Sequence, residues 1–324
     1  APIASRLVRY LGAAVDFVVT GTFFRYAAAY WRYALFAAYP MVLLVLIAAL
    51  SAAAAWLWGR VGLPGGGLMQ GLVAGAAALG LLALAGRRFH LNYMLSDWIF
   101  ARDMIRRRRP AIDARAAAFA KDIREGLARG DVDEVVILAH SLGAAWMVEA
   151  VARVLDAEPA ILARSPPLGL AGLGSSTLKI ALHPAAQWLR TSVKRVADVP
   201  AITWAEYDSH VDFICFYKNN TVEALGLVAQ SRPHRRSIRL SRMLSPATWQ
   251  RFRGNLLRIH RQYVMGNEQR YLYDFHMAAC GPFPFAAIVA EGDRLAGALG
   301  ADGSLAGATT PLTSTPATSS DLPA

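Results

Sequence analysis

The stretch Glu134-Val-Val-Ile-Leu-Ala-His-Ser-Leu-Gly-Ala144 decides the fold. Its first six residues form a short apolar run rich in Val and Ile, which is typical of a strand buried on both faces. The residues that follow, up to Leu155, have the pattern of a helix. Ser141 lies in the tight turn between them, with the small residues Ala139 and Gly143 two positions away on either side. Because a strand, a turn and a helix in this order are the context of a nucleophile elbow, we expect Ser141 to be a nucleophile.

The surroundings of the serine support this interpretation. We expect the residues two before and two after it to be small, because the turn presses them against neighbouring backbone. The helix that starts near Leu142 directs its first amides toward Ser141, so the Leu142 N–H is the expected donor to an oxyanion. The alternative is that Ser141 only caps the helix, since serine is favoured at that position. A cap directly after a Val/Ile strand is the less common arrangement.

Strand and helix patterns alternate on both sides of this stretch. Further strands are predicted at Leu168–Leu173, Ile202–Tyr207 and Ser237–Leu240. Further helices are predicted at Ala111–Arg129, Pro184–Ala197 and Pro246–Ile259. The alternation predicts an α/β fold with a parallel sheet and helices on its faces. Residues 300–324 are rich in Thr, Ser, Pro, Ala and Gly and are predicted to form a disordered tail.

Residues 34–86 are nearly free of charge. Arg60 is the only charged residue between Tyr33 and Gly86. The apolar stretches Leu35–Trp58 and Leu68–Ala85 each have about the length that crosses the hydrocarbon of a bilayer. Together they predict a transmembrane hairpin with a very short loop. The alternative, two buried helices of a globular core, is less favoured because such helices seldom lose all charge over this length.

Arginines flank both ends of the hairpin and are scarce in its loop. The flanking set is Arg6, Arg9, Arg25, Arg32, Arg87, Arg88, Arg102 and the run Arg106–Arg109. The loop contains only Arg60. Because positive residues stay on the cytoplasmic side, we expect both ends of the hairpin to face the cytoplasm. The run Arg106–Arg109 is explained equally well as a binding site for anionic lipid head groups and as a solvated helix face.

Composition limits the possible functions. The 324 residues are 55% hydrophobic and only 18% charged, with a net charge of +11 and a mean hydropathy of +0.31. These values exclude disorder as the main state and also a small, purely soluble module. No nucleic-acid motif accompanies the basic residues, so no nucleic-acid partner is expected. Two cysteines, Cys215 and Cys280, cannot build a disulfide framework or a Cys-based zinc site. No metal or cofactor is predicted, and the oligomeric state is left open.

The run Val136-Ile-Leu-Ala-His-Ser-Leu-Gly-Ala144 resembles the elbow of lipases and esterases of the α/β-hydrolase superfamily, with Ala139 in place of the usual glycine. The resemblance covers about Asp131–Phe285. The chain also resembles a bacterial subgroup in which a transmembrane hairpin accompanies the hydrolase domain. This second resemblance implies a multi-pass protein of the bacterial inner membrane. In this superfamily the triad has the chain order serine, acid, histidine.

The resemblance also implies the other two members of the triad. Trp204-Ala-Glu-Tyr-Asp-Ser-His-Val-Asp212 resembles the lipase pattern W-x-N-x-x-S-x-x-D, which places Asp212 at the acid position, with Asp208 as the alternative. His260, in Ile259-His-Arg-Gln-Tyr-Val264, resembles the H-x-x-Y around the catalytic histidine of some lipases. His276 and His234 are the alternatives for the base. Ser141 would attack the acyl carbon, His260 would move the proton, and Asp212 would orient the imidazole.

The resemblance implies a four-part organisation and an activity. Residues 1–33 would be a membrane-proximal segment, 34–86 the hairpin, 87–299 the hydrolase-like domain and 300–324 the tail. The implied activity is hydrolysis of a carboxylic ester, with a lipid ester as one option because the bilayer is a partner. No strand with the usual second oxyanion donor is visible before Asp131. Either such strands precede Ala1 and the chain is a fragment, or the donor comes from elsewhere. A catalytically inactive scaffold protein is the alternative function.

Overall fold

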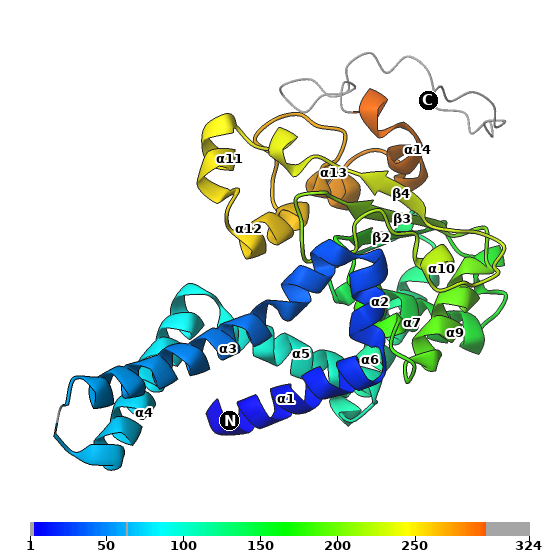
Figure 1. The fold of residues 1–324 in the computed structure, drawn as a ribbon. Coiled ribbons are helices and arrows are strands. Elements are labelled where there is room, and N and C mark those ends of the chain that lie inside the picture. The colour runs from blue at the N-terminus through cyan, green and yellow to red at the C-terminus, as the bar shows by residue number, and fades with distance from the viewer. Residues whose placement is uncertain (1–2, 63, 296–324) are drawn as a thin grey trace.

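The computed structural model describes residues 3–62 and 64–295 of the chain. Figure 1 shows an α/β unit built on a sheet and a long helical hairpin that extends away from it. The tail predicted at 300–324 lies outside the described residues.

Four strands form one parallel sheet in the order β1-β2-β3-β4, so that each pairs with the next along the chain. They are β1 (Val135–His140), β2 (Leu168–Leu173), β3 (Thr203–Asp208) and β4 (His234–Ser237). The register places His140 opposite Leu173, and Leu173 opposite Tyr207. The carboxyl ends of the first three strands therefore meet at one edge, where parallel sheets usually place their functional loops. The predicted α/β class and parallel sheet are confirmed.

Helices cover both faces of this sheet. They are α6 (Pro110–Leu127), α7 (Gly143–Ala157), α8 (Thr177–Ala181), α9 (Gln187–Ala197), α10 (Thr221–Ala224), α11 (Pro246–Phe252), α12 (Leu256–Arg261), α13 (Phe275–Cys280) and α14 (Phe285–Leu295). Successive side chains of β1 point to opposite faces. Val135 and Ile137 join the core under α7 and α9, whereas Val136 and Leu138 join the core formed with α12 to α14. The strand is apolar throughout because it contacts an apolar layer on each face.

The apolar hairpin consists of α3 (Trp31–Arg60) and α4 (Gly66–Arg88). Both helices are long and apolar enough to cross a membrane, as the charge-free stretches predicted. Their outer surfaces expose large apolar side chains instead of burying them, among them Val45, Leu50, Leu72 and Leu79. The first two turns of α3 differ, because Tyr33 is buried and stacks on Phe216 of the α/β unit with ring centroids 4.0 Å apart.

Three further helices join the hairpin to the α/β unit. They are α1 (Ile3–Val19), α2 (Thr22–Ala29) and α5 (Leu91–Ile105). One side of α1 packs on α5, where Phe17 and Trp98 meet edge to face at 4.5 Å. The opposite side of α1 exposes Val8, Leu11 and Val15. α1 and α2 form a pair bent by 66°. Counted as one span, the pair is also long and apolar enough to cross a membrane.

The arginine run after α5 is tied into the protein. Arg106 pairs with Asp16 of α1, Arg107 with Glu149 of α7, and Arg109 with Asp103. Because three of its four arginines have carboxylate partners, the run holds α1, α5 and α7 together. This arrangement favours neither of the two interpretations of the run, a binding site for lipid head groups or a solvated helix face.

Two elements differ from their prediction. The last strand begins at His234 and ends at Ser237, not at Ser237–Leu240, because β4 is an exposed edge strand whose side chains are mostly charged and carry no apolar signal. The helix predicted at Pro246–Ile259 is broken in two after Phe252. Gly254 interrupts it, and the Asn255 side chain caps α12 by accepting the Arg258 N–H at 3.0 Å.

Candidate active site

Ser141 has the backbone conformation of a nucleophile elbow. It lies between the end of β1 and the start of α7, and its φ is +57°, in the left-handed region that L-residues seldom adopt. Neighbouring loops hold it there. Its N–H donates to the Leu173 carbonyl at 2.9 Å, and its own carbonyl accepts the Ser176 N–H at 3.1 Å. A strained residue that its surroundings fix in place is typical of a functional site.

The two small residues of the elbow have different surroundings. Ala139 is buried within the sheet, opposite Gly172 of β2. Gly143 is exposed, and a Cβ atom added to it would meet no atom outside its own helix turn within 4 Å. The expected steric reason for a small residue at Gly143 is therefore wrong, because the first turn of α7 faces open space there.

His260 and Asp212 form a buried hydrogen-bonded pair. Nδ1 of His260 lies 2.8 Å from Oδ2 of Asp212, and the two side chains are 6% and 0% exposed. Since a carboxylate can only accept, Nδ1 carries the hydrogen and Nε2 has the free lone pair. The other oxygen of Asp212 accepts the Ile214 N–H at 2.9 Å, which fixes the carboxylate. Nε2 of His260 is buried and makes no hydrogen bond within the described structure.

The alternatives to these residues lie in other settings. Asp208 is occupied by the Lys218 N–H and the Arg235 guanidinium, both at 2.9 Å, and by the Ser237 hydroxyl. His276 has a 65% exposed side chain beside Asp274. His234 is exposed at the start of β4. None of the three contacts His260 or Asp212 through an interaction found in the described part of the chain.

His140, the residue before Ser141, connects the end of β1 to the His260–Asp212 pair. Its ring lies beside the ring of His260, with centroids 4.5 Å apart. Its Nε2 donates to the His260 carbonyl at 2.8 Å. Burial, aided by the adjacent His260, lowers the pKa of His140 to about 4. His140 is therefore neutral near pH 7 and positions α12 against the end of β1.

Ser141 faces a small cavity of about 20 Å³. The α/β unit contributes Ser141, Leu142, Ser176, Lys179 and Ile214 to its wall, and the helical part contributes Tyr33, Phe36, Tyr93 and Asp97. This volume holds about one water molecule. The Leu142 N–H belongs to the first turn of α7, whose amides have no partner within the helix. The cavity thus brings together the serine, a helix N-terminus and the base of the hairpin.

Sequence reasoning did not anticipate most of this wall. Ser176 and Lys179 follow β2, and polar residues directly after a buried strand were a signal that could have identified them. Tyr33 and Asp97 come from helices that had no visible relation to Ser141. No strand precedes β1 among residues 3–62 and 64–134, so the usual source of a second oxyanion donor is absent from the described chain.

The arrangement offers two groups suited to nucleophilic chemistry, the Ser141 hydroxyl and the imidazole of His260. Among the described residues, no group of three His, Cys, Asp or Glu side chains is placed to hold a metal ion. The chain matches no protein-family model, no curated protein and no solved structure. Its function is therefore inferred from the geometry of the site.

Proposed function

We propose that this chain is a membrane-anchored serine hydrolase of α/β-hydrolase type that cleaves a carboxylic ester, with Ser141, His260 and Asp212 as its triad. The observation that carries the proposal is the left-handed Ser141 at a strand–helix turn, together with a buried His260–Asp212 pair in which Nε2 of His260 has no hydrogen-bond partner among the described residues. A structural histidine usually satisfies both ring nitrogens when it is buried, because an unpaired polar atom is costly. An unpaired Nε2 is the group that a general base needs.

The residues have distinct roles in the proposed reaction. Ser141 Oγ attacks the carbonyl carbon of the ester while Nε2 of His260 accepts the hydroxyl proton. Asp212 holds the Nδ1 hydrogen and stabilises the imidazolium. The Leu142 N–H donates to the oxyanion. The carbon–oxygen bond of the ester then breaks, and the alcohol leaves with the proton from His260. Water, activated by the same imidazole, hydrolyses the acyl-serine and restores Ser141.

The serine and histidine must draw together for this reaction. Nε2 of His260 makes no hydrogen bond to Ser141 in this structure. Catalytic hydrogen bonds are often long before substrate binds and tighten in the complex. The cavity of about 20 Å³ must also open, because a drug-sized ligand occupies roughly 300 Å³ or more.

The position of the cavity favours a lipid ester as substrate. Tyr33 and Phe36 belong to the first turns of α3, which continues into the proposed membrane span. A lipid that moves along α3 would reach Ser141 without crossing water. The arginines around the hairpin support a cytoplasmic position for the α/β unit, with the bilayer as its partner. We propose the inner membrane of a bacterium as its location.

A fluorophosphonate probe tests the proposal, because it modifies only an activated serine. Membranes that contain the wild-type chain should be labelled, and Ser141→Ala should remove the label. Ser176→Ala is the matched control, because it removes a hydroxyl from the same cavity and should leave labelling in place. Wild-type protein that is folded but unlabelled would instead support an inactive scaffold, the second candidate. The closed cavity, and the lack of a strand among the described residues that precede β1, favour that candidate.

A further inference from the structure

A buried lysine lies in the wall of the Ser141 cavity. The side chain of Lys179 is 3% exposed, and its ammonium pairs with the Asp97 carboxylate and lies 5.4 Å from the centroid of the Trp98 ring. Lys179 and Asp97 both line the cavity with Ser141. A buried ammonium is costly unless it is paired, so an apolar residue would serve packing better. The proposed mechanism gives this cation no role.

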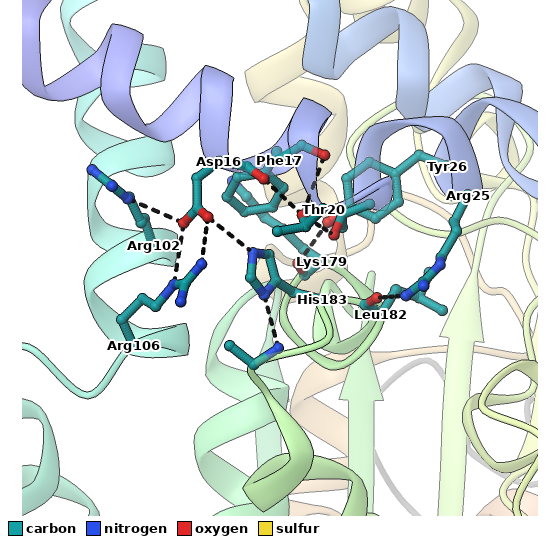
Figure 2. Close-up of polar contacts among 12 residues, drawn as sticks. Asp16, Phe17, Thr20, Arg25, Tyr26, Arg102, Arg106, Lys179, Leu182 and His183 are labelled. Carbon is teal, nitrogen blue, oxygen red and sulfur yellow. Dashed lines mark hydrogen bonds and ion pairs between the residues drawn. The ribbon is translucent and has the colours of Figure 1, made fainter.

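The backbone around Lys179 is held from outside the cavity. Figure 2 shows the segment from Lys179 to His183 beneath α1 and α2. The Tyr26 hydroxyl donates to the Lys179 carbonyl at 2.6 Å, and Arg25 donates to the Leu182 carbonyl at 2.6 Å. The buried His183 lies 3.7 Å from Asp16 of α1. These contacts fix the main chain of α8, so that the ammonium group keeps its place beside the cavity.

The two members of the ion pair differ in their exposure. Lys179 is almost fully enclosed, whereas the side chain of Asp97 is 23% exposed and Tyr93, one turn before it, is 58% exposed. Asp97 therefore lies at the outer rim of the cavity and Lys179 at its inner wall. A molecule that entered the cavity past Asp97 would separate the aspartate from the lysine. The lysine would then lose its counter-charge unless the molecule supplies one.

We infer that Lys179 is an anion-binding subsite beside Ser141, and that the substrate is a lipid ester carrying a negatively charged oxygen group, such as a phosphodiester. In the closed state Asp97 occupies the subsite and keeps the buried cation neutralised. In the substrate complex the anionic group takes its place. An uncharged ester would leave the ammonium unpaired and would bind less well. This inference rests on the proposed function and adds its substrate class.

Two esters with the same acyl chains test the inference. Phosphatidylglycerol and diacylglycerol are each added in trace amount to vesicles of zwitterionic ether-linked phospholipid, which contains no carboxylic ester and keeps the surface charge of the two preparations nearly equal. Lys179→Met should raise KM for phosphatidylglycerol on the order of 10- to 100-fold, as the loss of a charge-assisted hydrogen bond implies. Its effect on diacylglycerol should be less than about threefold, because that ester makes no ionic contact. Lys179→Arg, which keeps the positive charge, should retain the preference for phosphatidylglycerol over diacylglycerol.

Asp97→Asn supplies the opposite prediction. Removing the competing carboxylate should lower KM for phosphatidylglycerol and strengthen the preference over diacylglycerol. Lys194→Met is the matched control, because Lys194 forms an exposed pair with Asp198 and should leave both substrates unchanged. Equal losses on both lipids in Lys179→Met would overturn the inference, and so would an unchanged preference in Asp97→Asn. The aspartate variant alone decides the matter where Lys179→Met does not fold.

A binding measurement separates this inference from the proposed function. Ether-linked analogues of the two lipids are added in detergent to Ser141→Ala protein, and the retained lipid is measured. Preferential retention of the anionic analogue, lost in Ser141→Ala/Lys179→Met, supports the subsite even if wild-type protein hydrolyses neither ester. Equal retention of both analogues overturns the subsite, while fluorophosphonate labelling of Ser141 still stands or fails independently.

Discussion

The Nε2–H of His140 donates to the main-chain carbonyl of His260 at 2.8 Å, and the two imidazole rings lie 4.5 Å apart. The residue beside the proposed nucleophile thus holds the backbone of the proposed base. The contact joins the end of β1 to α12, which are 120 residues apart in the chain. It explains how His260, which lies in a helix and does not follow a strand, is held against the end of β1.

This relationship predicts a pH-dependent stability. Burial lowers the pKa of His140 to about 4, below the value of 6.5 for an exposed histidine. Between these values the unfolded chain binds one proton more than the folded chain. Stability is therefore full above about pH 6.5 and falls as the pH drops toward 4, by at most about 1.4 kcal/mol per pH unit. Thermal unfolding of detergent-solubilised protein at several pH values measures this loss.

His140→Gln should weaken that pH dependence, because glutamine does not titrate and can still donate to the His260 carbonyl. The melting temperature at pH 5 should then move closer to its value at pH 7. His183→Gln provides the comparison, since burial also lowers the pKa of His183, which lies beside Asp16 of α1 and not beside His260. A pH profile unchanged in His140→Gln would show that other groups dominate the acid sensitivity.

The left-handed conformation of Ser141 predicts an unusual order of stabilities. A residue with a Cβ atom at φ +57° is strained by about 1–2 kcal/mol, and glycine is not. Ser141→Gly should therefore be more stable than Ser141→Ala and unfold at a higher temperature. The difference in the free energy of unfolding should be about 0.5–1 kcal/mol, after the greater freedom of glycine in the unfolded chain is subtracted. Both variants should lose fluorophosphonate labelling. Equal or reversed melting temperatures would contradict a strained elbow.

The local parts of the site could be predicted from sequence because they depend on neighbours in the chain. A Val/Ile strand followed directly by His-Ser-Leu-Gly is compatible with few local structures. β2 begins and ends where the pattern places it, at Leu168 and Leu173. The pairing of Asp212 with His260 came from the resemblance to lipases. In the structure, Nδ1 of His260 lies 2.8 Å from Oδ2 of Asp212.

The remaining parts depend on tertiary packing and had no local signal. The Lys179–Asp97 pair joins residues 82 positions apart on helices that do not share a pattern. Tyr33 reaches the site only because the first turns of α3 pack on Phe216. β4 was misplaced because it is an edge strand of polar residues, Arg235 and Arg236 among them, which carry no apolar period. Periodicity detects burial against one layer, not which distant element supplies that layer.

The two aspartates after β3 should respond differently to the same substitution. Asp212→Asn should lower kcat on the order of 10⁴-fold, because the amide cannot hold Nδ1–H of His260 and favours the wrong tautomer. Asp208→Asn should leave kcat within about threefold but lower stability by about 1–2 kcal/mol, because it breaks the pair with Arg235. Steady-state kinetics and thermal unfolding of both variants separate the effects. Loss of turnover in Asp208→Asn would give the role of acid to that residue.

The cysteine on α13 tests the orientation of the protein. Cys280 is exposed, whereas Cys215 is buried, so an impermeant thiol reagent reports on Cys280 alone. If arginines keep both ends of the hairpin in the cytoplasm, wild-type protein in intact cells should stay unlabelled and should react once the cells are permeabilised. Gly67→Cys in a Cys280→Ser background should react in intact cells, because Gly67 is the second residue of α4, next to the outer loop, and a Cβ there meets no atom within 4 Å. Labelling of Cys280 in intact cells would place the α/β unit outside. The lipid that reaches Ser141 would then come from the outer leaflet, and the arginine-based orientation would be wrong.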